Sequence, residues 1–90
     1  MPGPPYRVEI APAAARDLRH LPPGDAARLR GPILALGIAP RPPGATRLTD
    51  SDWWRLRVGS LRLIYIIDDD QRVVVILRAA RRNERTYRGR

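Results

Sequence analysis

One predicted β-hairpin constrains the fold of this chain more than any other feature. Residues 53–58 and 61–67 are rich in aromatic, branched and basic residues, and Gly59-Ser60 separates them. A two-residue turn that begins with glycine is typical of a tight hairpin of the II′ kind. Such a turn fixes the register, and it predicts three pairs of facing positions: Val58 with Leu61, Arg57 with Arg62, and Arg55 with Ile64.

This register divides the hairpin into two faces of different character, because side chains alternate along a strand. The face expected to pack on helices carries Trp54, Leu56, Leu63 and Tyr65, joined by Val74 and Ile76 if the next turn has four residues. The other face carries Trp53, Arg55, Arg57 and Arg62, together with Ile64, Ile66, Val73, Val75 and Leu77. Apolar residues on both faces indicate that the tail, a second copy or a partner chain covers the second face.

The N-terminal half of the chain predicts one strand and two helices. Residues 6–10 alternate between apolar and charged residues, as in a strand, and residues 12–21 place apolar residues at helical spacing after Pro12. Asp25 is the expected N-cap of a second helix. Because an internal proline removes a helix hydrogen bond, we expect that helix to break at Gly31-Pro32.

The C-terminal half predicts a β-meander. A proline-rich loop over residues 38–46 leads into the hairpin, a turn at 68–71 follows it, and residues 72–79 form the last strand. We therefore expect an α+β fold. Its small antiparallel sheet would combine the N-terminal strand with the three-strand meander, and two helices would pack on one face.

Length and charge indicate a single domain that binds polyanions or acidic proteins. The 90 residues suffice for one domain, with a loose start at residues 1–5 and a basic tail at residues 81–90. All 17 basic residues are arginine, and with nine acidic residues the net charge is +8. The chain has no cysteine, which excludes disulfides, thiolate metal sites and cysteine nucleophiles. With no signal peptide and no apolar run long enough for a membrane span, we expect a cytoplasmic protein.

The arginines of the second hairpin face predict an anion site. Like charges that lie opposite each other in a sheet destabilise it, so Arg57 facing Arg62, with Arg55 diagonal to it, makes little sense for stability alone. An anion between them would resolve the conflict, since arginine grips phosphate with a planar fork. The alternative is that these arginines extend into water or pair with Asp50, Asp52 or Glu84.

Tyr87 is a candidate general base. It follows Arg81, Arg82 and Arg85 in a polar tail, and nearby cations lower the pKa of a tyrosine from its usual value of about 10. A phenol with a lowered pKa can accept a proton. The alternative is that the ring of Tyr87 only anchors the tail.

These residues carry a resemblance to the RelE/ParE superfamily, the toxins of bacterial toxin–antitoxin pairs. Residues 54–65 resemble its signature of an aromatic residue, two basic residues one apart, valine-glycine, and then arginine-x-x-tyrosine. Residues 81–88 resemble its closing basic-tyrosine motif. Because gyrase-inhibiting ParE members generally lack the tail tyrosine with its basic set, Tyr87 favours the RelE branch.

The resemblance implies a ribosome-dependent endoribonuclease that cleaves messenger RNA in the A site without a metal or cofactor. In that chemistry the 2′-hydroxyl attacks the adjacent phosphodiester. By motif, Arg55 and Arg57 would hold the substrate backbone, and Arg62 would stabilise the transition-state phosphate. Tyr87 would be the general base, and Arg81 or Arg82 would lie near the leaving group.

The resemblance also implies a cognate acidic antitoxin. We expect this antitoxin to place acidic and apolar residues over Ile64, Val73 and Val75 or beside the arginines. Two alternatives to the ribonuclease remain at this point. One is a ParE-type inhibitor of DNA gyrase, and the other is a basic RNA-binding domain without catalytic activity.

Overall fold

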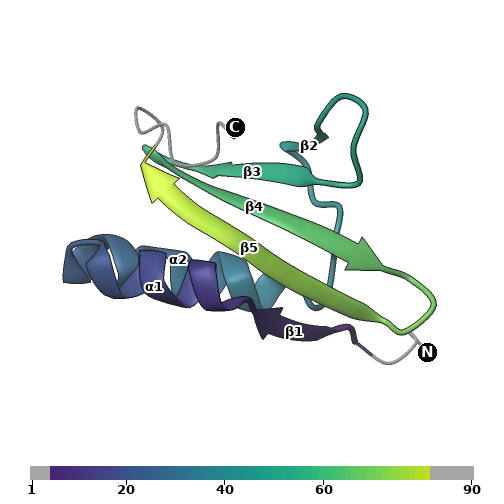
Figure 1. Cartoon of the computed structure of the whole chain (residues 1–90), viewed down its shortest axis with the longest axis horizontal. Coiled ribbons are helices and arrows are strands. Elements are labelled where there is room, and N and C mark those ends of the chain that lie inside the picture. The colour runs from purple at the N-terminus through teal and green to yellow at the C-terminus, as the bar shows by residue number, and fades with distance from the viewer. Residues whose placement is uncertain (1–4, 82–90) are drawn as a thin grey trace.

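The computed structural model describes residues 5–81 and confirms the α+β class. Two helices lie along one face of a five-stranded sheet (Figure 1). In chain order the elements are β1 (Arg7–Ile10), α1 (Pro12–His20), α2 (Pro23–Ala35), β2 (Ala45–Arg47), β3 (Trp54–Val58), β4 (Leu61–Asp68) and β5 (Val73–Arg81). The spatial order of the strands is β1-β5-β4-β3-β2.

The predicted hairpin register is confirmed. Val58 pairs with Leu61 and Arg55 with Ile64. Gly59 has a φ of +60°, a value that favours glycine and explains why this residue begins the turn. The following turn lies one residue later than expected, so that Asp68 pairs with Val73. That change moves the pairing by an even number of positions and leaves the side chains of residues 73–76 on their predicted faces.

Both edges of the sheet show features that the sequence did not predict. The expected sheet is mostly antiparallel, and β1 is the strand that runs parallel to its neighbour, β5. The short strand β2 covers residues 45–47, of which 45 and 46 are expected to be loop, and it pairs with β3. Alternation of side chains carries no information on strand direction, and three residues are too few for a pattern to be recognised. The direction of β1 and the presence of β2 therefore depend on how the connecting segments place these strands beside β5 and β3.

The second helix begins and continues differently from the prediction. Its N-cap is Pro22, and Asp25 lies in the first turn instead of at the cap. The helix also continues through Pro32 to Ala35 without the expected break. Leu29 and Ile33, on either side of Pro32, are both buried against the sheet. Their packing offsets the hydrogen bond that proline removes from the helix.

The core lies between the helices and one sheet face. Its buried members are Ala14, Leu29, Ile33 and Leu36 from the helical half and Leu61, Leu63, Tyr65, Val74, Ile76 and Ala79 from the sheet. Trp54 and Leu56 pack against it as predicted. On the opposite face Ile64 and Val73 are also buried, while Ile66, Val75 and Leu77 are half-buried.

Gly37 lies where the end of the helical layer meets β1. Its carbonyl oxygen accepts a hydrogen bond from the Tyr6 backbone N–H at 2.7 Å. A Cβ atom added at Gly37 would lie 2.9 Å from the backbone oxygen of Tyr6 and 3.0 Å from a methyl carbon of Val8. The absence of a side chain at Gly37 therefore allows β1 to approach the helical layer.

We predict that Gly37→Ala destabilises the protein by about 1–3 kcal/mol, because backbone atoms must move to accept the added carbon. Gly24→Ala is the matched control, since nothing lies within 4 Å of the added carbon there. Urea denaturation followed by circular dichroism measures both variants. Equal stability of the two variants would contradict the tight approach at Gly37.

Candidate functional site

Three arginines of the β3–β4 hairpin form the candidate site, which we call the arginine face. Arg57 lies directly opposite Arg62, and Arg55 lies opposite Ile64, next to that pair. All three alternate with core residues, so their positions belong to the sheet face away from the helices. Arg62 is buried at 6% exposure, Arg55 is half-buried and Arg57 is exposed.

The acidic residues that the structure describes are largely committed elsewhere. Asp52, one suggested partner of the arginines, lies 3.7 Å from Arg47 instead. The other ion pairs join Glu9 to Arg7, Asp17 to Arg78, Asp25 to Arg28 and Arg81, and Asp69 to Arg41. Within residues 5–81, neither Arg55 nor Arg57 forms an ion pair. Glu84, another suggested partner, lies outside the described residues.

The arginine face therefore concentrates positive charge around one buried guanidinium. Cβ atoms of facing residues in an antiparallel pair lie about 4.5–5.5 Å apart, so the side chains of Arg57 and Arg62 start from adjacent positions on one face. Such a pair binds an anion such as a phosphodiester more favourably than it binds solvent alone. The chemistry available to these three residues is electrostatic, because arginine stays protonated at all working pH values.

The structure brings Arg55, Arg57 and Arg62 together and places Arg81 elsewhere. Arg81 pairs with Leu61, a core residue, and its Nη2 donates to the carboxylate of Asp25 on α2 at 3.0 Å. Its side chain thus lies on the helix side of the sheet. Arg82 and Tyr87, the other predicted members of the site, lie outside the described residues.

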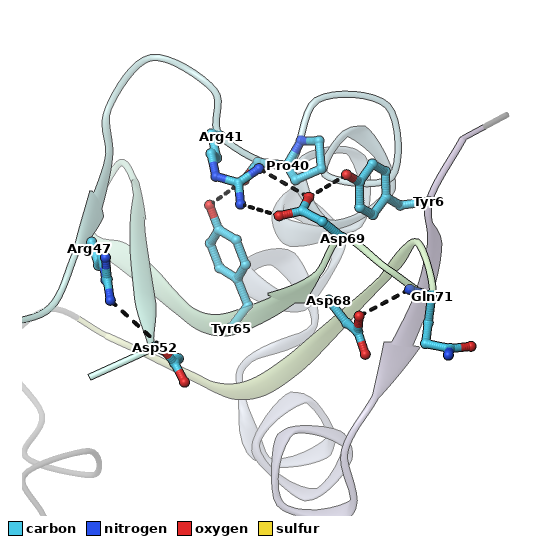
Figure 2. Close-up of polar contacts among 9 residues, drawn as sticks. All are labelled: Tyr6, Pro40, Arg41, Arg47, Asp52, Tyr65, Asp68, Asp69 and Gln71. Carbon is cyan, nitrogen blue, oxygen red and sulfur yellow. Dashed lines mark hydrogen bonds and ion pairs between the residues drawn. The ribbon is translucent and has the colours of Figure 1, made fainter. Parts of the chain in front are cut away.

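A polar cluster that the sequence did not predict closes the opposite end of the sheet. Asp69, in the β4–β5 turn, accepts hydrogen bonds from the Tyr6 hydroxyl and from Arg41 Nη2, the latter at 2.8 Å (Figure 2). Arg41 also lies over the Trp54 ring, 5.5 Å from its centroid. The hydrogen bond from Arg41 holds the pKa of Asp69 below its usual value. This cluster joins β1, the proline-rich loop and the last turn.

Tyr65 belongs to the core, as its position on the helix-facing side predicts. The side chain is fully buried, and its hydroxyl donates to the carbonyl oxygen of Pro40 at 2.8 Å (Figure 2). Burial raises the pKa of Tyr65 to about 12, because the ionised phenolate would lose its hydration there. Its ring supports the sheet, and its hydroxyl fixes the loop.

The described part of the chain contains no cluster of side chains suited to bind a metal ion. No three acidic or histidine side chains of residues 5–81 are arranged to hold an ion. In the acidic turn, Asp68 accepts the Gln71 backbone N–H at 3.0 Å, and Asp69 belongs to the polar cluster. His20 is exposed, with its Nδ1 atom 2.8 Å from the Arg16 carbonyl oxygen. None of the described helices is long and apolar enough to span a membrane.

Comparison with known proteins identifies the family. A family model described as ParE toxin of the type II toxin–antitoxin system, parDE, matches residues 8–85. The chain belongs to the RelE/ParE family of type II toxins. RelE1, a candidate toxin of Methanocaldococcus jannaschii, is 32% identical over 81 residues, which cover 86% of this chain and 90% of RelE1. The RelE resemblance inferred from the hairpin and the tail is therefore confirmed at the level of the family.

Solved structures of RelE toxins share the fold. In the RelBE2 toxin–antitoxin complex of Mycobacterium tuberculosis, the matched chain is 34% identical with a TM-score of 0.79, over 87% of this toxin and 99% of that chain. In the RelE–RelB complex of Pyrococcus horikoshii, the matched chain is 27% identical with a TM-score of 0.72, over 88% and 97%. The toxin described here is thus RelE-like in both sequence and fold.

We predict that Tyr65 makes the stability of this toxin fall at alkaline pH. Its pKa of about 12 exceeds the unfolded value of about 10, so the stabilisation it contributes is present below pH 10 and is lost as the pH rises toward 12. Tyr65→Phe lacks the hydroxyl and should be about 1 kcal/mol less stable at pH 7, because the Pro40 carbonyl loses its donor.

Urea denaturation of both proteins between pH 8 and pH 11.5 measures this effect. The stability advantage of the wild type should shrink above pH 10 and reverse before pH 11.5, because about 2 kcal/mol of the roughly 2.7 kcal/mol that two pKa units represent is lost by then. A constant difference between the two proteins would show that the Tyr65 pKa is not raised.

Proposed function

We propose that this toxin is a ribosome-dependent endoribonuclease that cleaves messenger RNA in the A site. The observation that carries the proposal is the arginine face, where Arg57 and Arg62 lie directly opposite each other in one hairpin. Neighbouring like charges suit a substrate with closely spaced phosphates, which describes an RNA backbone. The hairpin motif and the tail tyrosine, rather than net charge, favour a nuclease over a passive RNA-binding domain.

The proposed reaction uses groups of the substrate and of this chain, together with a proton from water. The substrate 2′-hydroxyl attacks the adjacent phosphorus and loses its proton to Tyr87. The bond from phosphorus to the 5′ oxygen breaks, which leaves a 2′,3′-cyclic phosphate and a 5′-hydroxyl after the leaving oxygen takes a proton from water. The reaction passes through a crowded, negatively charged phosphate, and Arg62 would stabilise that charge.

The remaining positions of the site take binding and supporting roles. Arg55 and Arg57, half-buried and exposed, would grip the neighbouring phosphates. Because Arg81 is held by Asp25 on the helix side, we favour Arg82 as the arginine near the leaving group. The sequence alone leaves the choice between Arg81 and Arg82 open.

We further propose that a cognate acidic antitoxin covers the arginine face. The solved relatives in the RelBE2 and RelE–RelB complexes assemble with an antitoxin. Ile64 and Val73, two expected contacts, are already buried. Ile66, Val75 and Leu77 are half-buried on this face and remain available for contact. Acidic side chains on the partner would neutralise the arginines and speed association, while apolar ones would hold the complex.

Two parallel assays distinguish the proposed activity from gyrase inhibition. Cut sites on messenger RNA are mapped in a translating extract with and without the toxin, and DNA gyrase supercoiling is measured with the same preparation. Cleavage at codon positions together with unchanged supercoiling supports the proposal. Inhibited supercoiling without RNA cleavage would assign the toxin to the ParE type.

We predict that Arg62→Ala lowers the cleavage rate by about 10²–10³-fold, because the transition-state phosphate loses a charged contact. Arg57→Ala, at an exposed position, should weaken substrate binding instead. Arg7→Ala removes the same charge from an exposed position on β1 and serves as the control. Circular dichroism confirms that each variant is folded. Wild-type cleavage by a folded Arg62→Ala variant would remove Arg62 from the site.

We predict that Tyr87→Phe lowers single-turnover cleavage on programmed ribosomes by about 10²–10⁴-fold, which is the usual contribution of general-base catalysis. Ribosome binding should remain nearly unchanged, since Arg55 and Arg57 are intact. If Tyr87 only anchors the tail, phenylalanine will be tolerated and Tyr87→Ala alone will impair activity. Near-wild-type cleavage by Tyr87→Phe would therefore remove Tyr87 from the site as the general base.

A further inference from the structure

A β-bulge interrupts the pairing of β4 with β5 near its middle. On one side Tyr65 pairs with Ile76, and on the other side Ile64 pairs with Arg78. Leu77 is therefore an extra residue in β5 with no partner on β4. One extra residue moves every following side chain of the strand to the opposite face.

The bulge decides which face receives each of the last residues of β5. With it, Ala79 pairs with Leu63 and Arg81 with Leu61, so both lie on the helix side. Without it, the earlier register would continue and place Arg78 opposite Leu63, within the apolar core. Burial of that charge among apolar side chains would be costly, which disfavours the unshifted register.

The carboxylate of Asp17 on α1 binds this bulge directly. Its Oδ2 accepts the Ala79 backbone N–H at 3.0 Å and Arg78 Nε at 2.8 Å, while its Oδ1 accepts Arg78 Nη2 at 3.0 Å. Only 13% of the Asp17 side chain is exposed. Hydrogen bonding to Asp17 also raises the pKa of Arg78 above its ordinary value.

Asp17 occupies the position where a neighbouring strand would otherwise supply an acceptor. β1 pairs with β5 only as far as Ile76, and α1 packs beside the residues that follow. In the described chain, the Ala79 backbone N–H thus donates its hydrogen bond to a side-chain carboxylate instead of to a backbone carbonyl. This bond forms only when Ala79 has the orientation that the bulge gives it.

We propose that Asp17 is a positioning residue that fixes the register of the end of β5 and thereby keeps Ala80 opposite Arg62 and Arg81 on the helix side. The bulge places Arg81 near Asp25 on the helix side, away from the arginine face. A shift of one position in the register of β5 on β4 would bring Arg81 to the arginine face. Its positive charge would then lie beside Arg62 and change the arrangement of charges there. The effect on cleavage rests on the proposed function, whereas the effect on register does not.

Two measurements on the folded toxin test this proposal. Nuclear Overhauser contacts between β4 and β5 report whether Arg62 faces Ala80, and amide hydrogen exchange reports protection of the Ala79 N–H. The variants are Asp17→Ala, which removes the acceptor, and Asp17→Asn, which keeps one oxygen acceptor without the charge. Glu9→Gln is the matched control, because it makes the same charge change in an exposed ion pair away from the bulge.

We predict that Asp17→Ala increases exchange at Ala79 at least about tenfold and removes the contacts between Arg62 and Ala80. Its cleavage rate should fall by about 10–100-fold with KM nearly unchanged, since misplacement of catalytic groups affects the rate while Arg55 and Arg57 still bind substrate. Asp17→Asn should show intermediate values for both readouts. Glu9→Gln should match the wild type in every measurement.

Arg78→Gln separates the ion pair from the backbone contact, because it leaves Asp17 able to accept the Ala79 N–H. We expect this variant to retain the register. Retention of the register and of Ala79 protection in Asp17→Ala would overturn the proposal, and if that variant does not fold, the same outcome in Asp17→Asn would do so. Loss of register in Arg78→Gln would overturn it as well. Absence of cleavage by the wild type would refute the proposed function and leave the register result to decide this proposal.

Discussion

The register of the β3–β4 hairpin is the constraint on which the rest of the structure depends. Gly59 adopts a positive φ that lets the chain reverse within two residues, and this pairs Val58 with Leu61. From that point, alternation gives the helices an apolar sheet face and collects Arg55, Arg57 and Arg62 on the other. A slip of one residue would bury the arginines and expose the core, so the fold and the candidate site share one determinant.

The helical layer contributes more than apolar surface to this arrangement. Asp17 on α1 binds Arg78 and Asp25 on α2 binds Arg81, so each helix uses a carboxylate to hold the end of β5. These contacts commit the carboxylates of Asp17 and Asp25 to arginines of β5. Together with the exposed pairs elsewhere, they leave the arginine face positive, which is the property that both an RNA backbone and an acidic antitoxin would recognise.

The polar cluster and the arginine face lie at opposite ends of the sheet. At one end, the cluster of Tyr6, Asp69 and Arg41 joins β1, the proline-rich loop and the last turn, and Tyr65 fixes the same loop through Pro40. At the other end lies the arginine face, beside the hairpin turn. Hydrogen bonds at the end of the sheet far from the proposed site thus connect its strands and loops independently of the arginine face.

The sequence alone determined the hairpin, the faces of its side chains and the family, because a glycine-led turn and strict alternation are local signals. It also grouped Arg55, Arg57 and Arg62, whose spacing is fixed by that turn. Only the tertiary structure decided the parallel direction of β1, the continuity of α2 through Pro32, the bulge at Leu77 and the attachment of Arg81 to Asp25. Each of these depends on contacts between segments far apart in the chain, where packing and hydrogen bonding outweigh local preference.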